Sequence, residues 1–291
     1  MPPRPDGIVT RFAPSPTGCL HIGHAYSALF AHRKASESGG RFILRLEDID
    51  ATRCRPEYAQ GITEDLRWLG LTWEEPVRKQ SEHMDDYRAA LGRLEAAGLL
   101  YPCFCSRRDI QEEIARAPAA PHGPEGALYP GLCRGLSASE RNDRIAAGNT
   151  YALRLDMTAA LSRLAAPLFW EDIAQGRQAA HPEILGDVVL ARKDTPASYH
   201  LCVTIDDHLQ GVTCVTRGED LFHASHLHRL LQHLLRLNVP VWHHHPLLLD
   251  DAGRRFAKRN HSVTLQHMRE QGKTPEDIRA GMAHFAAVRL P

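Results

Sequence analysis

The part of the sequence that most constrains the fold is residues 7–46, where two short apolar runs enclose a proline-rich loop and a helical pattern. Residues 7–12 (GIVTRF) and 41–46 (RFILRL) are typical of buried strands. Between them, apolar side chains recur with helical spacing over residues 21–38, and Gly39-Gly40 ends the pattern. The order strand, helix, strand predicts a βαβ unit and therefore a parallel sheet.

Further segments extend this α/β pattern along the chain. Residues 57–70 and 83–98 predict amphipathic helices, and Asp220 is the expected N-cap of a helix that ends at Leu235. Strands are expected at 187–191, 199–205 and 212–216, with a turn-rich connection at 206–211. In doubly wound sheets ligands bind at the carboxyl ends of the strands. We therefore expect the chemistry after Phe12, Leu46 and Thr216, and near Leu249.

Composition excludes several classes of protein. No stretch approaches the roughly 20 apolar residues of a membrane span, and the N-terminus has no apolar signal-peptide core, so we expect a cytoplasmic protein. The 35 basic residues equal the 35 acidic ones, so any nucleic-acid contact has to come from a local patch. From Arg254 onward eight Lys/Arg stand against three Asp/Glu, which fits such a patch and equally a solvated helix face.

Residues 11–24 (RFAPSPTGCLHIGH) form the motif with the clearest chemistry. The run has neither the glycine triplet of dinucleotide sites nor the GK[ST] of a P-loop. It does place His21, Gly23 and His24 at the expected N-terminus of a helix, where free N–H groups and the helix dipole favour phosphate. Gly23 permits close approach of a nucleotide, and the two imidazoles can donate hydrogen bonds to phosphoryl oxygens. We expect ATP to bind here.

The same run resembles the signature of class I aminoacyl-tRNA synthetases, in the form found in the glutamyl and glutaminyl enzymes. That family carries a lysine loop late in the chain, and Arg255-Phe-Ala-Lys258-Arg259 matches it. Arg255 and Ala257 replace a lysine and a serine of the family pattern, which keeps the charge and removes a hydroxyl. The resemblance implies that His21, His24 and Lys258 stabilise negative charge while a carboxylate attacks the α-phosphate of ATP, with Mg²⁺ accompanying the nucleotide.

The resemblance also implies the residues that hold the amino acid. Glu47 matches a ligand of the α-amino group, although alone it would be a structural ion pair more often than a ligand. Tyr199 and Arg217 match positions that hold L-glutamate in glutamate-specific members. An acidic substrate needs guanidinium groups for its carboxylate and one carboxylate for its ammonium. The first motif supplies the rest of this expected pocket, namely Arg11, Phe12, Ala13, Pro14 and Ser15.

Seven cysteines in a chain without an export signal favour reduced thiols or a metal site over disulfides. Cys103, Cys105 and Cys133 have the spacing of a structural zinc site, and the alternative is three buried free thiols. The resemblance implies Tyr129 as the fourth ligand. His243-His244-His245 is not interpreted as a metal site, because adjacent side chains on a strand point to opposite faces.

These observations together predict an α/β protein built on a doubly wound parallel Rossmann-type sheet. The two halves of the catalytic domain are expected at 1–100 and 186–258, separated by an inserted zinc-containing α/β subdomain at 101–185. A short helical tail is expected at 259–291, with helices at 263–271 and 275–285. Only 33 residues follow Lys258, too few for an anticodon-binding domain.

A catalytic core of this extent is similar to the glutamyl-queuosine tRNA(Asp) synthetases. The resemblance implies a monomer that activates L-glutamate with ATP and transfers it to the queuosine base at the wobble position of tRNA(Asp). The basic C-terminal segment would then contact backbone phosphates. Two alternatives stay open: a truncated glutamyl-tRNA synthetase that charges the 3′ end of tRNA(Glu), and a non-catalytic binding protein.

Overall fold

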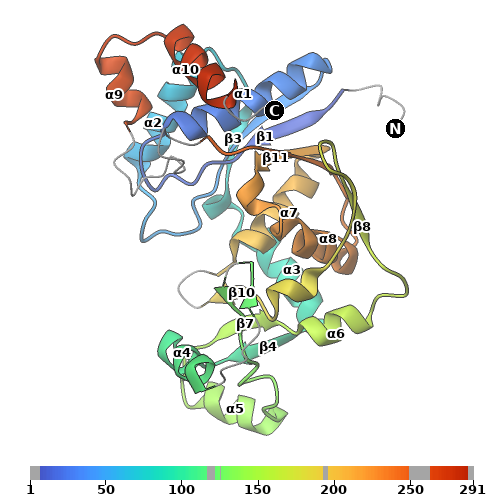
Figure 1. Cartoon of the computed structure of the whole chain (residues 1–291). Coiled ribbons are helices and arrows are strands. Elements are labelled where there is room, and N and C mark those ends of the chain that lie inside the picture. The colour runs from blue at the N-terminus through green and yellow to red at the C-terminus, as the bar shows by residue number, and fades with distance from the viewer. Residues whose placement is uncertain (1–6, 117–121, 125, 193–195, 249–262, 288–291) are drawn as a thin grey trace.

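The computed structural model describes residues 7–116, 122–124, 126–192, 196–248 and 263–287. Its central feature is a set of parallel strands (Figure 1). One sheet has the order β1-β2-β3 and the other β11-β12-β8-β9. The amide of Thr213, just before β11, donates to the Val9 carbonyl of β1 at 3.0 Å, so the two sheets meet at β1 and β11. The strands are β1 Val9–Phe12, β2 Arg41–Leu46, β3 Glu74–Lys79, β8 Phe169–Asp172, β9 Gly176–Ala179, β11 Cys214–Gly218 and β12 Val241–His245.

Helix α1 (Ile22–Glu37) packs on β1, β2 and β11 through a face of small residues. Ala25, Ala28 and Ala31 are completely buried on this face, and the Thr10 hydroxyl donates to the Ala31 carbonyl at 2.8 Å. Small side chains let the helix axis approach the sheet closely. The return to β2 is equally tight, because a Cβ on Gly40 would lie 2.1 Å from the Ile8 carbonyl oxygen. This βαβ unit matches the expected one.

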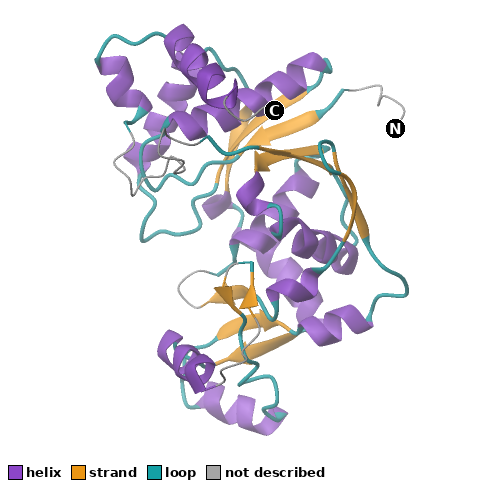
Figure 2. Ribbon diagram, viewed as in Figure 1, coloured by secondary structure: helices purple, strands orange, loops and turns teal. Residues whose placement is uncertain are grey.

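The remaining helices gather in separate groups (Figures 1 and 2). Helices α2, α9 and α10 surround α1 and share an apolar core with it, whereas α3, α7 and α8 form a second core beneath the sheet. The two C-terminal helices lie where the tail was expected. The helices are α2 Pro56–Trp68, α3 Met84–Ala96, α4 Arg107–Arg116, α5 Ala138–Ala146, α6 Met157–Ser162, α7 Tyr199–Leu209, α8 Ala224–Leu235, α9 Leu265–Glu270 and α10 Pro275–Ala287, with 3₁₀ turns at Gln80–Glu82, Pro182–Leu185 and Glu219–Leu221.

A small antiparallel sheet of order β10-β7-β4 lies at the opposite end of the molecule from α1 (Figure 1). Its strands are β4 Leu100–Cys103, β7 Ala152–Leu155 and β10 Val189–Arg192, and a two-residue pair, β5 His122–Gly123 with β6 Gly126–Ala127, lies apart from it. The hairpin of β8 and β9 also falls within 101–185, yet it pairs with β12 of the large sheet. The expected division at residues 101 and 185 stays a prediction.

Two local predictions are wrong. Residues 199–205 form the start of helix α7, not a strand, and the helix continues through the expected turn to Leu209. The helix is buried on nearly every side, so its apolar residues show no helical period, while Ser198 caps it and Gly211, with φ +65°, follows its end. Asp220 does not cap α8, because it lies in a 3₁₀ turn and the helix begins at Ala224 after His223.

The prediction of an α/β fold with parallel sheets is confirmed. Within the residues that the structure describes, no helix has the length and apolar character needed to cross a membrane.

Candidate active site

A cleft of about 540 Å³ opens at the carboxyl ends of β1, β2 and β11. Its position agrees with the rule that ligands of such sheets bind beyond the carboxyl ends of the strands. Eleven of the twelve residues expected to bind ATP or glutamate line it: Arg11, Phe12, Ala13, Pro14, Ser15, His21, Gly23, His24, Glu47, Tyr199 and Arg217. The twelfth, Lys258, lies outside the described residues together with Arg255 and Ala257.

The two histidines of the first motif shape the N-terminus of α1. His21 is the N-cap residue, and its Nδ1 accepts from the Gly23 amide at 3.1 Å. His24 Nδ1 accepts from the His21 amide at 3.2 Å, so each imidazole satisfies a backbone donor. The ring centroids are 3.8 Å apart. An imidazole that accepts through Nδ1 carries its hydrogen on Nε2 when neutral, which makes Nε2 the donor toward a ligand.

The segments that flank the lysine loop return to this histidine pair. Thr264 forms an isolated antiparallel bridge with His21, and the Leu265 amide donates to the Leu20 carbonyl at 2.9 Å. Leu248, on the other side of the loop, lines the same cleft. The described residues on either side of 249–262 therefore lie near the N-terminus of α1.

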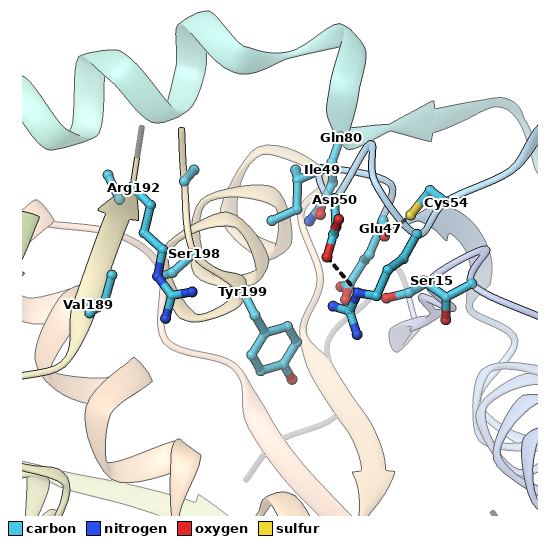
Figure 3. A pocket seen from close by; sticks show the side chains of 14 residues that line it. Ser15, Glu47, Ile49, Asp50, Cys54, Gln80, Val189, Arg192, Ser198 and Tyr199 are labelled. Atoms are coloured by element: carbon cyan, nitrogen blue, oxygen red, sulfur yellow. Dashed lines mark hydrogen bonds and ion pairs between the residues drawn. The ribbon is translucent and has the colours of Figure 1, made fainter. Parts of the chain in front are cut away.

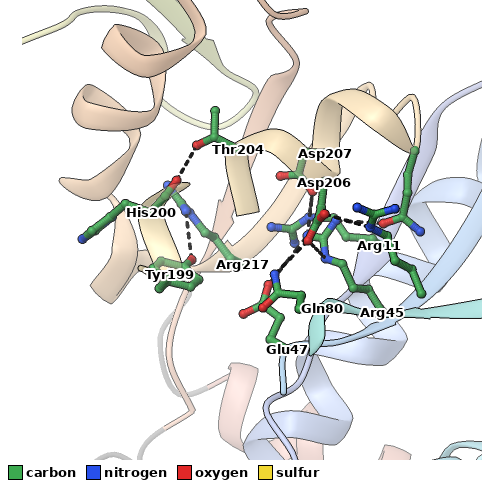
Figure 4. Close-up of polar contacts among 12 residues, drawn as sticks. Arg11, Arg45, Glu47, Gln80, Tyr199, His200, Thr204, Asp206, Asp207 and Arg217 are labelled. Atoms are coloured by element: carbon green, nitrogen blue, oxygen red, sulfur yellow. Dashed lines mark hydrogen bonds and ion pairs between the residues drawn. The ribbon is translucent and has the colours of Figure 1, made fainter. Parts of the chain in front are cut away.

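The guanidinium of Arg217, on β11, is buried among uncharged acceptors, of which Figure 4 labels Tyr199. Its Nε donates to His244 Nε2 at 3.2 Å and its Nη2 to Ser225 Oγ at 2.6 Å. Nη1 lies 3.3 Å from His228 Nδ1 and 3.4 Å from the Tyr199 hydroxyl. Across the described part of the chain no carboxylate forms an ion pair with Arg217. A buried cation without an anionic partner is a strong attractor for an anionic ligand.

The imidazoles around Arg217 are neutral at physiological pH. Burial lowers the pKa of His244 to about 4, and the positive charge of Arg217 adds to the effect. Burial and Arg217 likewise lower the pKa of His200 to about 4 and hold the pKa of His228 well below its ordinary value. These side chains accept or relay hydrogen bonds without adding a second positive charge to the pocket.

Arg11 lines the same cleft, but its charge is already matched. Its Nε contacts Asp207 Oδ1 at 3.0 Å and its Nη1 donates to the Thr216 carbonyl at 3.0 Å. The same Asp207 oxygen accepts from Arg45 Nη2 at 2.7 Å (Figure 4). Attraction to the two guanidiniums outweighs burial and lowers the pKa of Asp207. The two arginines expected to bind a carboxylate therefore differ in their partners: Arg11 already pairs with Asp207, whereas Arg217 has no carboxylate partner among the described residues.

Glu47 lies one residue after β2 and faces the cleft. Its carboxylate is buried and contacts Arg45 Nη2 at 3.7 Å, a loose ion pair. Burial raises the pKa of Glu47 to about 7, against the attraction of Arg45 and Arg11. A carboxylate in this condition gains from an ammonium group placed next to it.

A second cavity of about 250 Å³ adjoins the first (Figure 3). Ser15, Thr17, Glu47 and Tyr199 line both cavities. The remaining wall comes from the segment after β2, from Gln80 and from the stretch leading into α7: Ile49, Asp50, Arg53, Cys54, Val189, Ala191, Arg192, Ala197 and Ser198. The two cavities therefore share a wall that contains Glu47 and Tyr199.

The three cysteines with metal-ligand spacing come together beside the small sheet β10-β7-β4, and this sheet with the cysteine cluster is called the small-sheet module below. The Sγ atoms of Cys103, Cys105 and Cys133 all lie within 4.8 Å of one another. The Tyr129 hydroxyl is 3.3 Å from Cys103 Sγ and 3.5 Å from Cys105 Sγ, and it accepts from the Cys133 amide at 2.9 Å. Three thiols and one phenol around a common point fit the tetrahedral donor set of a structural metal ion.

The three-histidine run divides between the faces of β12, as strand geometry requires. His243 and His245 contact Phe30 of α1, with ring centroids 4.7 Å and 5.2 Å away. His244 points to the other face, where its Nδ1 lies 2.6 Å from Asp172 Oδ2.

Sequence reasoning missed the buried residues that hold Arg11 and Arg217 in place. Asp207 was assigned to a turn, and His244 was considered for metal binding alone. Asp172, Ser225 and His228 carry no motif. Two buried acidic residues in sequence at 206–207 were the available signal, because adjacent buried carboxylates require cationic partners.

The chain matches the family of "tRNA synthetases class I (E and Q), catalytic domain" over residues 7–288. It is 49% identical over 278 residues to the "Glutamyl-Q tRNA(Asp) synthetase" of Rhodobacter capsulatus, covering 94% of this chain and 98% of that relative. The "Glutamate--tRNA ligase" of Aquifex aeolicus is 36% identical over 273 residues, which is 93% of this chain and 55% of the ligase.

Solved structures agree with this assignment. The glutamate tRNA ligase from Elizabethkingia meningosepticum, determined in complex with its amino acid, superposes with a TM-score of 0.77 at 28% identity. The match covers 93% of this chain and 59% of the ligase. The chain therefore belongs to the class I tRNA synthetases of the E and Q group. It is a ligase of the aminoacyl-tRNA synthetase type.

Proposed function

We propose that this enzyme activates L-glutamate with ATP to glutamyl-adenylate and transfers the glutamyl group to tRNA. The observation that carries the proposal is the buried guanidinium of Arg217, which is surrounded by uncharged acceptors and lines the cleft. It offers a site for the side-chain carboxylate of glutamate. A glutamine amide would leave the buried charge uncompensated.

The other residues of the cleft have complementary roles in this proposal. Glu47 binds the α-ammonium group, and Tyr199 lies between the two ends of the amino acid site. The α-carboxylate attacks the α-phosphorus of ATP, the bond to the bridging oxygen breaks, and pyrophosphate leaves. Few proton transfers are needed, so catalysis rests on alignment and on donors that stabilise negative charge. The N-terminus of α1 supplies these donors with His21, Gly23 and His24, and Lys258 supplies a further one, with Mg²⁺ accompanying ATP.

Pyrophosphate exchange tests the activation step. Wild-type enzyme should exchange labelled pyrophosphate into ATP when glutamate is added, and far less with glutamine or aspartate. Lys258→Ala should reduce the exchange by about 100-fold or more, the loss typical when a preorganised charge-stabilising group is removed. Absence of glutamate-dependent exchange in the wild type would favour the alternative of a non-catalytic binding protein.

We further propose that the acceptor is the queuosine base of tRNA(Asp). Support comes from relatives named for that reaction, one of which aligns over nearly its whole length. A hydroxyl of the base attacks the carbonyl carbon of glutamyl-adenylate, an ester bond forms, and AMP leaves. Labelled glutamate should therefore appear in the anticodon fragment after nuclease digestion of tRNA(Asp), and it should vanish with tRNA(Asp) lacking queuosine. Label on the 3′-terminal adenosine of tRNA(Glu) would instead support a glutamyl-tRNA synthetase.

The cysteine cluster suits Zn²⁺, and we propose that Cys103, Cys105, Cys133 and Tyr129 hold one structural zinc ion. Thiolate donors and tetrahedral closure are typical of structural rather than catalytic zinc. The ion would tie the loop after β4 to the segment before α5.

A further inference from the structure

Arg217 is held by a buried chain of side chains that begins on another strand. Asp172 ends β8, and its Oδ2 lies 2.6 Å from Nδ1 of His244, with both side chains fully buried. His244 in turn accepts from Arg217 Nε at 3.2 Å. The chain Asp172–His244–Arg217 thus runs from the β8–β9 hairpin across β12 to the cleft.

The hydrogen-bond pattern fixes the tautomer of His244. A guanidinium can only donate, so Nε2 of His244 must present its lone pair to Arg217. The ring hydrogen then sits on Nδ1 and is donated to Asp172. The Ser225 hydroxyl, 3.3 Å from Nε2, fits as a further donor to the same lone pair. Removing the acceptor at Asp172 would allow the opposite tautomer, whose Nε2–H would oppose the Nε–H of Arg217.

Asp172 is also kept away from the guanidinium itself. Its Oδ1 accepts from the Ala174 and Gln175 amides, both at 2.9 Å, and its Oδ2 also accepts from the His244 amide at 3.2 Å. Burial raises the pKa of Asp172, but the hydrogen bonds from His244 and Gln175 prevail and lower it, so the carboxylate is ionised. A neutral imidazole stands between this anion and Arg217. Direct pairing would have cancelled the charge that attracts a ligand.

We propose that Asp172 is a positioning residue for recognition of the acidic substrate side chain: it fixes His244 as an acceptor, which orients Arg217 while leaving its charge available. The inference rests on the proposed role of Arg217 in glutamate binding. It gives the β8–β9 hairpin, which lies within 101–185, a function in the amino acid site.

Asp172→Asn is the sharpest test, because it separates two roles of the carboxylate. The amide oxygen of asparagine can still accept from Ala174 and Gln175 and so keep the turn. Its NH₂ group then faces His244, where it requires an acceptor at ring Nδ1, which reverses the tautomer, and where the backbone N–H of His244 loses its weaker acceptor. We expect the Kd for glutamate, measured by calorimetry, to rise about 10- to 100-fold, the size of one lost hydrogen bond to a charged group. The Kd for ATP should stay unchanged.

Gln178→Ala is the matched control, because the Gln178 amide donates to the Gln175 and Gly176 carbonyls of the same turn without touching His244. It should leave glutamate binding at the wild-type value. Equal losses in both variants, unchanged glutamate binding in Asp172→Asn, or parallel losses of ATP and glutamate binding would each overturn the inference.

Ring ¹⁵N spectra of histidine-labelled wild-type protein give a second readout that does not require Asp172→Asn to fold. The His244 signals, assigned by their loss in His244→Gln, should show hydrogen on Nδ1 in the wild type. Hydrogen on Nε2 would refute the proposed relay. Pyrophosphate exchange separates this inference from the proposed function: weakened glutamate binding in Asp172→Asn without any wild-type exchange would sustain the relay and reject the enzyme activity.

Discussion

At the scale of single residues, the cleft contains buried charged side chains that lack a close partner of opposite charge in the part of the chain that the structure describes. Arg217 lacks an anionic partner among the described residues, and Glu47 has a loose one. Each side chain is buried, so each charge carries an unfavourable desolvation energy that a bound ligand of opposite charge would offset. An amino acid with an ammonium at one end and a carboxylate at the other relieves both. The site is therefore complementary to a zwitterion with an additional negative charge.

Glu47 should set the lower pH limit of glutamate binding. Because burial raises its pKa to about 7, the carboxylate becomes protonated below that pH and loses its attraction for an ammonium group. We expect the KM for glutamate in pyrophosphate exchange to rise as the pH falls from 8 to 6, while the KM for ATP changes little. A KM for glutamate that is independent of pH over this interval would show that Glu47 is not the ammonium ligand.

The same shift predicts a stability effect of defined sign. The native state holds a proton on Glu47 up to about pH 7, whereas the unfolded chain releases it near the ordinary glutamate pKa of 4.5. Stability from this residue therefore falls as the pH rises between these values, by about 3 kcal/mol. Glu47→Gln should become progressively more stable than wild type from pH 5 to pH 8 in urea unfolding, even as it loses glutamate binding. A constant difference would contradict the raised pKa.

At the scale of elements, the sequence determined β1, α1 and β2 almost to the residue. A polar loop, a helical period and two glycines mark their limits, and all of that information is local. The prediction for helix α7 was wrong because the apolar residues of this helix face α3, α8 and β10 at once, so the sequence shows no helical periodicity there. The acidic partner of Arg11 and Arg45 was not predicted for a different reason. Asp207 lies 196 and 162 residues away from them, and no local pattern encodes that contact.

The alanine face of α1 should tolerate little additional volume. Ala28 is fully buried against the sheet, so Ala28→Leu forces the helix outward and should cost about 1–3 kcal/mol. The displaced N-terminus of α1 should also raise the KM for ATP. Arg33→Leu introduces the same side chain on the exposed face of the helix and serves as the control. Equal denaturant midpoints for the two variants would mean that α1 is not closely packed on the sheet.

The cysteine cluster should stabilise its own module without serving the cleft. We expect about one zinc per chain by elemental analysis of wild type and little in Cys133→Ser, together with a lower Tm. The KM for glutamate should stay near the wild-type value, since Cys103, Cys105 and Cys133 line neither of the two cavities. Cys54→Ala, which alters a thiol outside the cluster, should retain the metal. Full zinc content in Cys133→Ser would reject the proposed ligand set.

At the scale of the whole molecule, one buried ionic network joins segments that are far apart in the sequence. Arg45 of β2 contacts Asp207 at 2.7 Å and Asp206 at 3.8 Å, both on α7. Arg78 of β3 and Tyr87 of α3 also donate to Asp206, at 2.8 Å and 2.9 Å. Attraction to these carboxylates outweighs burial and raises the pKa of Arg45. Residues before 100 and after 186 therefore share one set of buried charges beneath the cleft.

Arg45→Met should accordingly be the most destabilising of the changes considered. It leaves buried carboxylates on α7 with fewer cationic partners, and breaking such a pair from one side costs about 3–5 kcal/mol. Arg41→Met on the same strand removes an arginine whose pair with Glu74 is half exposed, and it should cost less than about 1 kcal/mol. Denaturant unfolding followed by circular dichroism measures both. Because the network joins β2, β3 and α3 to α7, Arg45→Met should shift a single transition to lower denaturant. Two separated transitions already in the wild type would show that these elements unfold independently and that the network does not couple them.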